Sequence, residues 1–142
     1  MPVTLEIITN PEQQDLDDLI KIYRDYPQAP ANDLGQWVGE RLDQGHQCFA
    51  ARFNGRLLGA VWAAPSSTSN SWQLEYLCVR TVTRRRGVAS QLLTLLAQHA
   101  AIQALSLTID QQTISPELKA LFGKTSLPSA EHQQPATGAM TG

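Results

Sequence analysis

Arginines cluster in one stretch of the chain that contains no acidic residue. Between positions 76 and 109 the charged residues are Arg80, Arg84, Arg85 and Arg86. The last three lead into Gly87-Val88-Ala89, where a predicted strand gives way to a predicted helix. A helix that begins there directs backbone N–H groups and a partial positive charge at one point, and small residues let an anion approach the backbone. The pattern therefore predicts a phosphate-binding loop.

The alternative to a phosphate-binding loop is that Arg84, Arg85 and Arg86 form only a solvated basic turn before an ordinary helix. Neither G-x-G-x-x-G nor G-x-x-x-x-G-K-[ST] occurs, so a dinucleotide fingerprint or a Walker loop does not account for the cluster. The basic charge is also local, because the whole chain has 11 Lys and Arg against 13 Asp and Glu, a net charge of −2. We therefore expect neither general nucleic-acid binding nor polybasic membrane binding.

Two helices are predicted near the N-terminus, after a short β-branched strand over residues 3–9. Asn10-Pro11-Glu12 offers an N-cap, a proline at the first helical position and an early acid. Asp33 and Gln36 are typical of a capping box, and the helix that they begin continues to Gly45. The first helix has an apolar stripe that faces the core, made of Leu16, Leu19, Ile20, Tyr23 and Tyr26.

From Gln47 onward the hydrophobic period changes to two, which indicates strands. Asn54-Gly55 separates two alternating runs and predicts a type I′ hairpin turn with positive φ at both residues. A helix after Gly87 and a strand over residues 105–109 indicate a parallel crossover. A third strand is expected over residues 72–80, with one face formed by Trp72, Leu74, Tyr76 and Cys78.

Together these elements predict an α/β fold with a mixed, mainly antiparallel sheet flanked by helices. The chain has 142 residues, 42% of them hydrophobic, which suits one domain with a single core. We expect that domain to span residues 1–127. Residues 128–142 are rich in Ser, Gln, Pro, Thr and Gly and lack periodicity, so we expect a disordered tail.

The segment LCVRTVTRRRGVA at 77–89 resembles motif A of the GNAT superfamily. The resemblance implies a GNAT-like fold and an acyl-CoA pyrophosphate loop that binds acetyl-CoA or CoA. Arg84, Gly87 and Ala89 fall on the family's Arg/Gln-x-x-Gly-x-Gly/Ala positions. The cofactor-binding residues that it implies are Leu77, Cys78, Val79, Thr83, Arg84, Arg85, Arg86, Gly87, Val88, Ala89 and Ser90.

Three strings resemble a narrower family of small GNAT-like proteins: AARFN at 50–54, RLL at 56–58 and VTRRRGV at 82–88. That family senses acetyl-CoA and promotes self-cleavage of the aspartate decarboxylase proenzyme, which supplies the pantothenate pathway. The resemblance therefore implies a regulatory protein whose partner is this proenzyme, contacted through Arg52, Asn54 and Arg56 on the hairpin. The chain departs from the family in a longer segment over residues 27–45, in Ala89 for a usual Gly, and in its tail.

An active N-acetyltransferase that acts on an unknown amine is the alternative. Such an enzyme needs a base for the ammonium proton and usually an acid for the leaving thiolate. Glu75 is the candidate base, although a carboxylate on a partly exposed strand is more often solvated. In GNAT enzymes the acid is commonly a Tyr after the last helix, and Phe122 has that place here without a hydroxyl. We therefore assign no catalytic residue.

The remaining reactive residue types form no second site. His46, His99 and His132 are scattered, which argues against a metal cluster or a Ser/His/Asp triad. Cys48 and Cys78 lie in apolar runs without CxxC spacing, so we expect reduced core residues and a cytoplasmic protein. No apolar run approaches the roughly 20 residues that span a bilayer, and no export signal is visible. The three tryptophans are interpreted as core or interface anchors.

Overall fold

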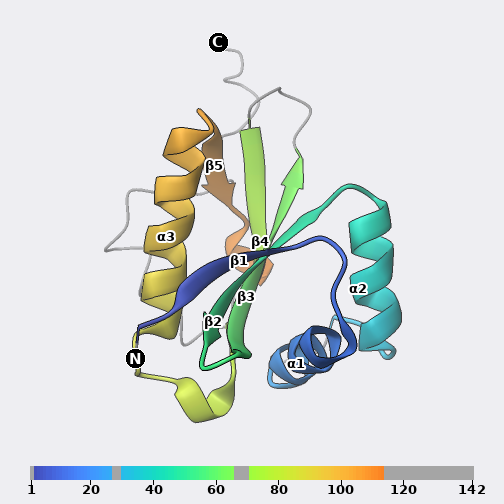
Figure 1. The fold of residues 1–142 in the computed structure, drawn as a ribbon. Coiled ribbons are helices and arrows are strands. Elements are labelled where there is room, and N and C mark those ends of the chain that lie inside the picture. The colour runs from blue at the N-terminus through green and yellow to red at the C-terminus, as the bar shows by residue number, and fades with distance from the viewer. Residues whose placement is uncertain (1, 27–29, 66–70, 114–142) are drawn as a thin grey trace.

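In the computed structural model, residues 2–26, 30–65 and 71–113 of the chain are described. A five-stranded sheet forms the middle layer, with one helix on one face and two helices on the other (Figure 1). The strands are β1 (Thr4–Ile8), β2 (Gln47–Phe53), β3 (Arg56–Pro65), β4 (Ser71–Val79) and β5 (Ser106–Ile109). The helices are α1 (Gln13–Arg24), α2 (Leu34–Asp43) and α3 (Val88–Ile102), with short 3-10 turns η1 (Thr81–Thr83) and η2 (Gln111–Thr113).

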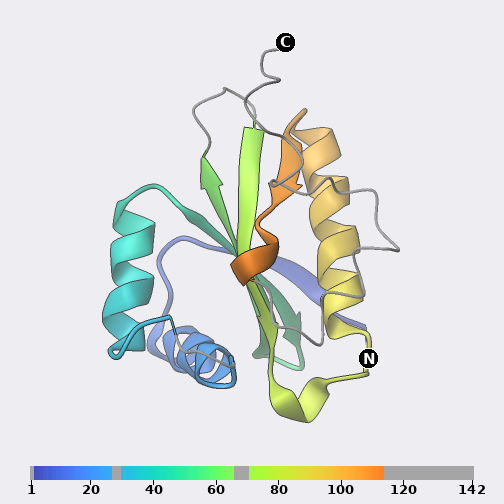
Figure 2. The same ribbon diagram turned by 180° about the vertical axis from the view of Figure 1, so that it is seen from behind.

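The strands are ordered β1-β2-β3-β4-β5 across the sheet. The first three pairings are antiparallel, whereas β5 runs parallel to β4 after the crossover through α3. The predicted mixed, mainly antiparallel α/β fold is therefore confirmed. Viewed from behind, η2 lies across β4 just beyond the end of β5 (Figure 2), and the Tyr76 N–H donates to Thr113 Oγ1 at 2.9 Å.

The sheet is buried on both faces, as its mostly apolar strands require. Alternate residues of β2 go to opposite sides: Phe49 and Ala51 pack in the cluster under α3, while Cys48 and Ala50 pack in the cluster under α1 and α2. The stripe predicted for α1 contacts the second cluster, with Leu19 and Tyr23 fully buried. The strands of the sheet therefore cannot slip in register without exposing one of the two clusters.

The expected common face of Trp72, Leu74, Tyr76 and Cys78 is wrong. Leu74 packs under α3, but Tyr76 and Cys78 pack under α1 and α2. The cause is a β-bulge: Trp62 faces Glu75 while Ala60 faces Cys78, so β4 has one extra residue, and Tyr76 takes a φ of 54°. Such an extra residue moves the following side chains to the other face of the sheet.

The local turn chemistry is mostly as predicted. Asn54 (φ 51°) and Gly55 (φ 79°) form the two-residue turn between Phe53 and Arg56. Asp33 caps α2 by accepting from the Gln36 N–H at 3.0 Å. The predicted start of α1 is wrong, because Glu12 and not Asn10 is its N-cap, and Pro11 precedes the helix.

Candidate functional site

The predicted phosphate-binding loop connects β4 to α3 and contains η1. Arg85 has a φ of 66°, and Gly87, the N-cap of α3, has a φ of 79°. Left-handed residues in such a turn direct successive N–H groups toward one side, which forms an anion-binding concavity. The first turn of the 15-residue α3 adds N–H groups that have no intrahelical acceptor. This backbone can bind an anion.

Asp25, at the C-cap of α1, forms hydrogen bonds with three residues at the start of the loop. Its Oδ2 accepts from the Thr81 N–H at 2.9 Å and from Arg80 Nε at 3.2 Å, and its carbonyl accepts from Arg84 Nη2 at 3.4 Å. Burial alone would raise the pKa of Asp25, but the Thr81 N–H and the Arg80 guanidinium lower it below the ordinary value. The ionised carboxylate therefore joins the end of α1 to the start of the loop.

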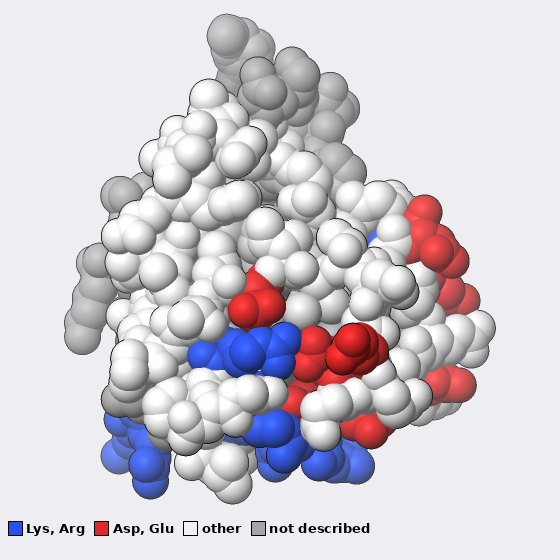
Figure 3. All heavy atoms as spheres, viewed as in Figure 1, with Lys and Arg blue, Asp and Glu red and all other residues white. Residues whose placement is uncertain are grey.

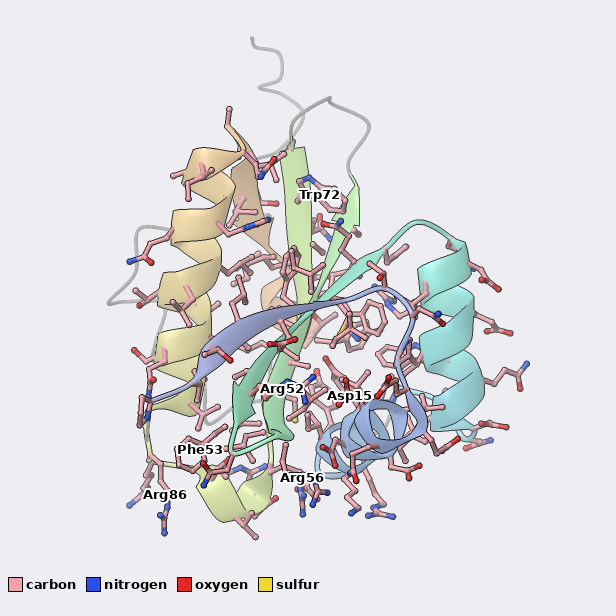
Figure 4. The ribbon with its side chains drawn as sticks, in the orientation of Figure 1. Asp15, Arg52, Phe53, Arg56, Trp72 and Arg86 are labelled. Atoms are coloured by element: carbon pink, nitrogen blue, oxygen red, sulfur yellow. The ribbon has the colours of Figure 1, made fainter. Side chains whose placement is uncertain are left out.

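The residues that the resemblance implies for the cofactor fall into three groups. Exposed positions follow the loop: Arg85, Arg86, Gly87 and Ser90, with Arg84 half-buried. Arg86 points away from the ribbon at the N-terminal end of α3 (Figure 4). Thr83, Val88 and Ala89 are buried and brace the loop; the Thr83 hydroxyl donates to the Arg80 carbonyl at 2.8 Å. Leu77, Cys78 and Val79 are buried in β4.

The buried β4 residues offer backbone groups to a ligand in place of side chains. The Arg80 N–H donates to the Leu58 carbonyl at 2.9 Å, and Cys78 lies opposite Ala60 on β3. Antiparallel strands alternate their hydrogen bonds, so Leu77 and Val79 direct their N–H and C=O groups away from β3. On that side β5 pairs only with residues 71–74 of β4. Within the described ranges this edge of β4 therefore has no strand partner.

Neither cysteine is arranged as a nucleophile. The Cys78 thiol donates to the Ile22 carbonyl at 3.4 Å. Burial raises the pKa of the Cys48 thiol far above its ordinary value, so the thiolate is not available. Both residues pack in the cluster under α1 and α2, as predicted for small core residues.

The hairpin tip is exposed at Asn54, but its two arginines turn back toward α1. Arg52 pairs with both carboxylate oxygens of Asp15, at 3.1 and 2.9 Å, so the two side chains lie next to one another (Figure 4). Arg56 Nη2 contacts Asp18 Oδ1 at 2.6 Å. Of the two arginines predicted for the partner surface, Arg52 is half-buried with 23% of its side chain exposed, whereas Arg56 keeps 47% of its side chain exposed while it pairs with Asp18.

Asp18 is the buried member of these pairs. It accepts from Arg56 Nε, from Arg56 Nη2 and from the Leu57 N–H at 3.1 Å, and only 1% of the residue is exposed. Burial would raise the pKa of Asp18, but the Arg56 hydrogen bonds and the Leu57 N–H outweigh it and lower the pKa below the ordinary value. The carboxylate is thus held ionised beneath the hairpin.

Charged groups on this face of the molecule lie along its lower edge and over α2 on its right side (Figure 3). Figure 3 shows Lys and Arg side chains along the lower edge with Asp and Glu beside them, while the area over α3 has no charged side chain. Between α1 and the hairpin lies a polar hollow of about 430 Å³, lined by Gln14, Asp17, Ile20, Lys21, Arg24 and Arg56.

Sequence reasoning missed the surroundings of Glu75, the candidate base. Its side chain is 17% exposed and forms an ion pair with Arg41 of α2, so the interpretation as a solvated residue is wrong. Gln73 Nε2 donates to the other carboxylate oxygen at 3.3 Å. The spacing of Trp37 and Arg41 by one helical turn is a weak signal for this network, but its other members lie on separate strands.

Several predicted residues lie outside the described ranges, namely Phe122, His132 and the expected tail at 128–142. In the portion that the structure describes, no three His, Cys, Asp or Glu side chains are grouped to hold a metal ion. No helix in the same portion is long and apolar enough to cross a membrane.

A family model described as "Acetyltransferase (GNAT) domain, PanZ" matches residues 2–135. The "PanD regulatory factor" of Salmonella typhimurium strain LT2 is 40% identical over 92 residues, which are 65% of this chain and 64% of that protein. The match thus spans less than two thirds of that relative's length.

Solved structures agree on the fold. The ribosomal-protein-alanine N-acetyltransferase of Brucella melitensis biovar Abortus 2308 superposes with a TM-score of 0.68 at 19% identity, covering 91% of this chain and 94% of that one. An aminoglycoside 6'-N-acetyltransferase complexed with coenzyme A has a TM-score of 0.62 at 19% identity, covering 73% and 60% of the two chains. The architecture is therefore that of GNAT domains.

The Asp18 contacts predict how stability depends on pH. Because folding lowers the pKa of Asp18 below the unfolded value of about 3.9, the stability that it contributes is present above about pH 4 and is lost as pH falls through the folded pKa. Asp18→Asn should lower the free energy of unfolding by about 1–3 kcal/mol at pH 7, with a difference from the unmodified chain that shrinks toward pH 2.

Urea unfolding at a series of pH values measures this difference, with Asp17→Asn as the control because Asp17 is an exposed neighbour on the same helix. A difference that stays constant from pH 7 to pH 2 would contradict the assignment.

Proposed function

The chain belongs to the PanZ family of GNAT acetyltransferase domains, and from this membership we propose that it binds acetyl-CoA or CoA and promotes self-cleavage of the aspartate decarboxylase proenzyme. In this role it regulates pantothenate and CoA biosynthesis in the cytoplasm. The CoA part of the proposal rests on two sets of backbone groups: the N–H groups of the loop before α3, and the groups of Leu77 and Val79 on the edge of β4 that has no strand partner within the described ranges.

The residues present fit the chemistry of CoA. Its pyrophosphate is an anion that suits the N–H groups around Gly87 and the exposed Arg85 and Arg86. The pantetheine arm carries amides in an extended chain, and amides can pair with the backbone groups of Leu77 and Val79. Bound acetyl-CoA would supply an activated thioester; the residues named here bind and orient it.

The partner surface that we propose is the hairpin tip with its supporting helix. Asn54 is exposed on a rigid two-residue turn, and Arg52 and Arg56 are held beside it by α1. Asp25, at the C-cap of the same helix, accepts from the Thr81 N–H at the start of the predicted phosphate-binding loop. If acetyl-CoA and the proenzyme favour the same conformation, each must strengthen the binding of the other, which would make the protein a sensor of the pathway's product.

The site favours this regulatory role over amine acetylation. A general base must be free to accept a proton from the substrate ammonium. Glu75 is instead paired with Arg41 in a largely buried network.

Replacement of Arg85 and Arg86 by Ala should weaken CoA binding by about 1.5 to 3 kcal/mol for each charge-assisted hydrogen bond to the pyrophosphate that the change removes. Isothermal titration with CoA measures the effect. Lys21 and Arg24 are basic residues on α1, outside the loop, so Lys21→Ala with Arg24→Ala is the matched control for net charge. Equal affinity of the loop variant and the unmodified chain would mean that the basic turn is only a solvated surface.

Asn54→Gly should impair acetyl-CoA-dependent cleavage of the proenzyme without weakening CoA binding. Glycine adopts the positive φ of this turn without strain, so the change removes the side-chain amide and leaves the backbone. Asn54→Ala removes the same amide and adds about 1 kcal/mol of turn strain, which separates the two effects. Cleavage is followed by gel, with Asn32→Gly, an exposed Asn before α2, as the control. Normal cleavage by both Asn54 variants would exclude the tip as the docking surface.

A further inference from the structure

The guanidinium of Arg41 lies inside a cage of three aromatic rings, which we call the Arg41 cage. Its Cζ is 5.2 Å from the ring centroid of Trp37, 5.2 Å from that of Trp62 and 5.1 Å from that of Tyr76. Each distance is within the roughly 6 Å at which a cation is attracted to an aromatic face. The side chain of Arg41 is only 12% exposed, so these attractions act with little screening by water.

The open side of the cage is closed by polar groups. Glu75 forms the ion pair described above, and His46 Nδ1 lies 2.8 Å from Arg41 Nη2. Burial and the neighbouring Arg41 lower the pKa of His46, which favours a neutral ring that accepts from the guanidinium. Three aromatic faces and one carboxylate around a buried charge are the features by which proteins recognise organic cations.

The walls of the cage contact one another independently of Arg41. The Trp37 ring meets the Trp62 ring edge-on at 5.6 Å and the Tyr76 ring at 5.2 Å, and Tyr23 packs behind Trp37 at 5.1 Å. The Tyr23 hydroxyl donates to the Tyr76 carbonyl at 2.7 Å, which holds the bulge of β4 in place. Because the three rings come from α2, β3 and β4 and Tyr23 of α1 supports them from behind, the walls can persist without the cation.

Two buried N–H groups of the cage have no hydrogen-bond acceptor among the described residues while Arg41 occupies it. The Nε of Arg41 and the Nε1 of Trp62 are buried, and neither has a hydrogen-bond partner among the atoms that the structure describes. Buried donors without acceptors oppose burial of the group that carries them. In a variant that lacks the Arg41 side chain, an untethered guanidinium is not bound to the geometry of α2 and can take its own orientation toward Glu75.

We propose that the Arg41 cage is a binding site for an external alkylguanidinium, which Arg41 occupies in cis and thereby excludes. The rings recognise the planar cation and Glu75 supplies the counter-charge. The tether gives Arg41 a high effective concentration in the site, so an external cation competes poorly with it. Removal of the Arg41 side chain leaves Glu75 partly buried without its partner, and a guanidinium of matching size restores the pair.

The test uses the full chain with Arg41→Ala and methylguanidinium as the probe. Binding is followed by the fluorescence of the tryptophans in the cage and by the melting temperature. We expect at least tenfold tighter binding to Arg41→Ala than to the unmodified chain, and a rise in melting temperature for the variant alone. Methylurea has the same shape without the charge and should do neither. Arg41→Met, which fills the cage with an apolar chain, should not respond to methylguanidinium.

If Arg41→Ala does not fold alone, it is refolded with methylguanidinium or with methylurea and followed by near-UV circular dichroism. Recovery with methylguanidinium only supports the proposal, and failure with both contradicts it. Glu75→Gln added to Arg41→Ala should abolish the response, because the counter-charge is gone. Equal effects of methylguanidinium and methylurea, or an unchanged response in the double variant, would overturn the proposal.

Discussion

Three aspartates, on α1 and at its C-cap, hold the β2–β3 hairpin and the loop before α3 against the same helix. Asp15 binds Arg52 at the end of β2, Asp18 binds Arg56 and the Leu57 N–H at the start of β3, and Asp25 binds Arg80 and the Thr81 N–H at the start of the loop. The hairpin tip and the predicted phosphate-binding loop are far apart in sequence, yet both are held against the same helix. Asp18 and Asp25 each accept a backbone N–H as well as a guanidinium, and hydrogen bonds to an ionised carboxylate are stronger than those between neutral groups.

The bulge in β4 is the second constraint, and α1 supports it as well. Tyr76 has a left-handed backbone, and the Tyr23 hydroxyl stabilises this geometry by donating to the Tyr76 carbonyl. After the bulge the side chains change faces, and β5 pairs only with residues 71–74 of β4, so among the described residues Leu77 and Val79 have no strand partner on that side. The same shift brings Tyr76 beside Arg41. One extra residue thus lies between the part of β4 that pairs with β5 and the part that we propose for CoA.

Features with local causes were predictable from the sequence. The Asn54-Gly55 turn and the cap at Asp33 each follow from one or two residues. The bulge at Tyr76 was not, because alternation of apolar residues continues through it and the register depends on β3. The Arg41 cage was not, because its walls come from three elements. The capping signal at Asn10 was misleading, since the N-cap of α1 is Glu12, two residues later. Sequence reasoning identified the loop and the exposed turn, but it did not identify what holds them.

The central claim is that one conformation binds both acetyl-CoA and the decarboxylase proenzyme. The most direct measurement is an isothermal titration of the proenzyme with this chain, once with saturating acetyl-CoA and once without it. We predict an affinity for the proenzyme that is about 5- to 150-fold tighter with acetyl-CoA, the range of a coupling free energy of 1–3 kcal/mol. The same affinity in both titrations would contradict the claim.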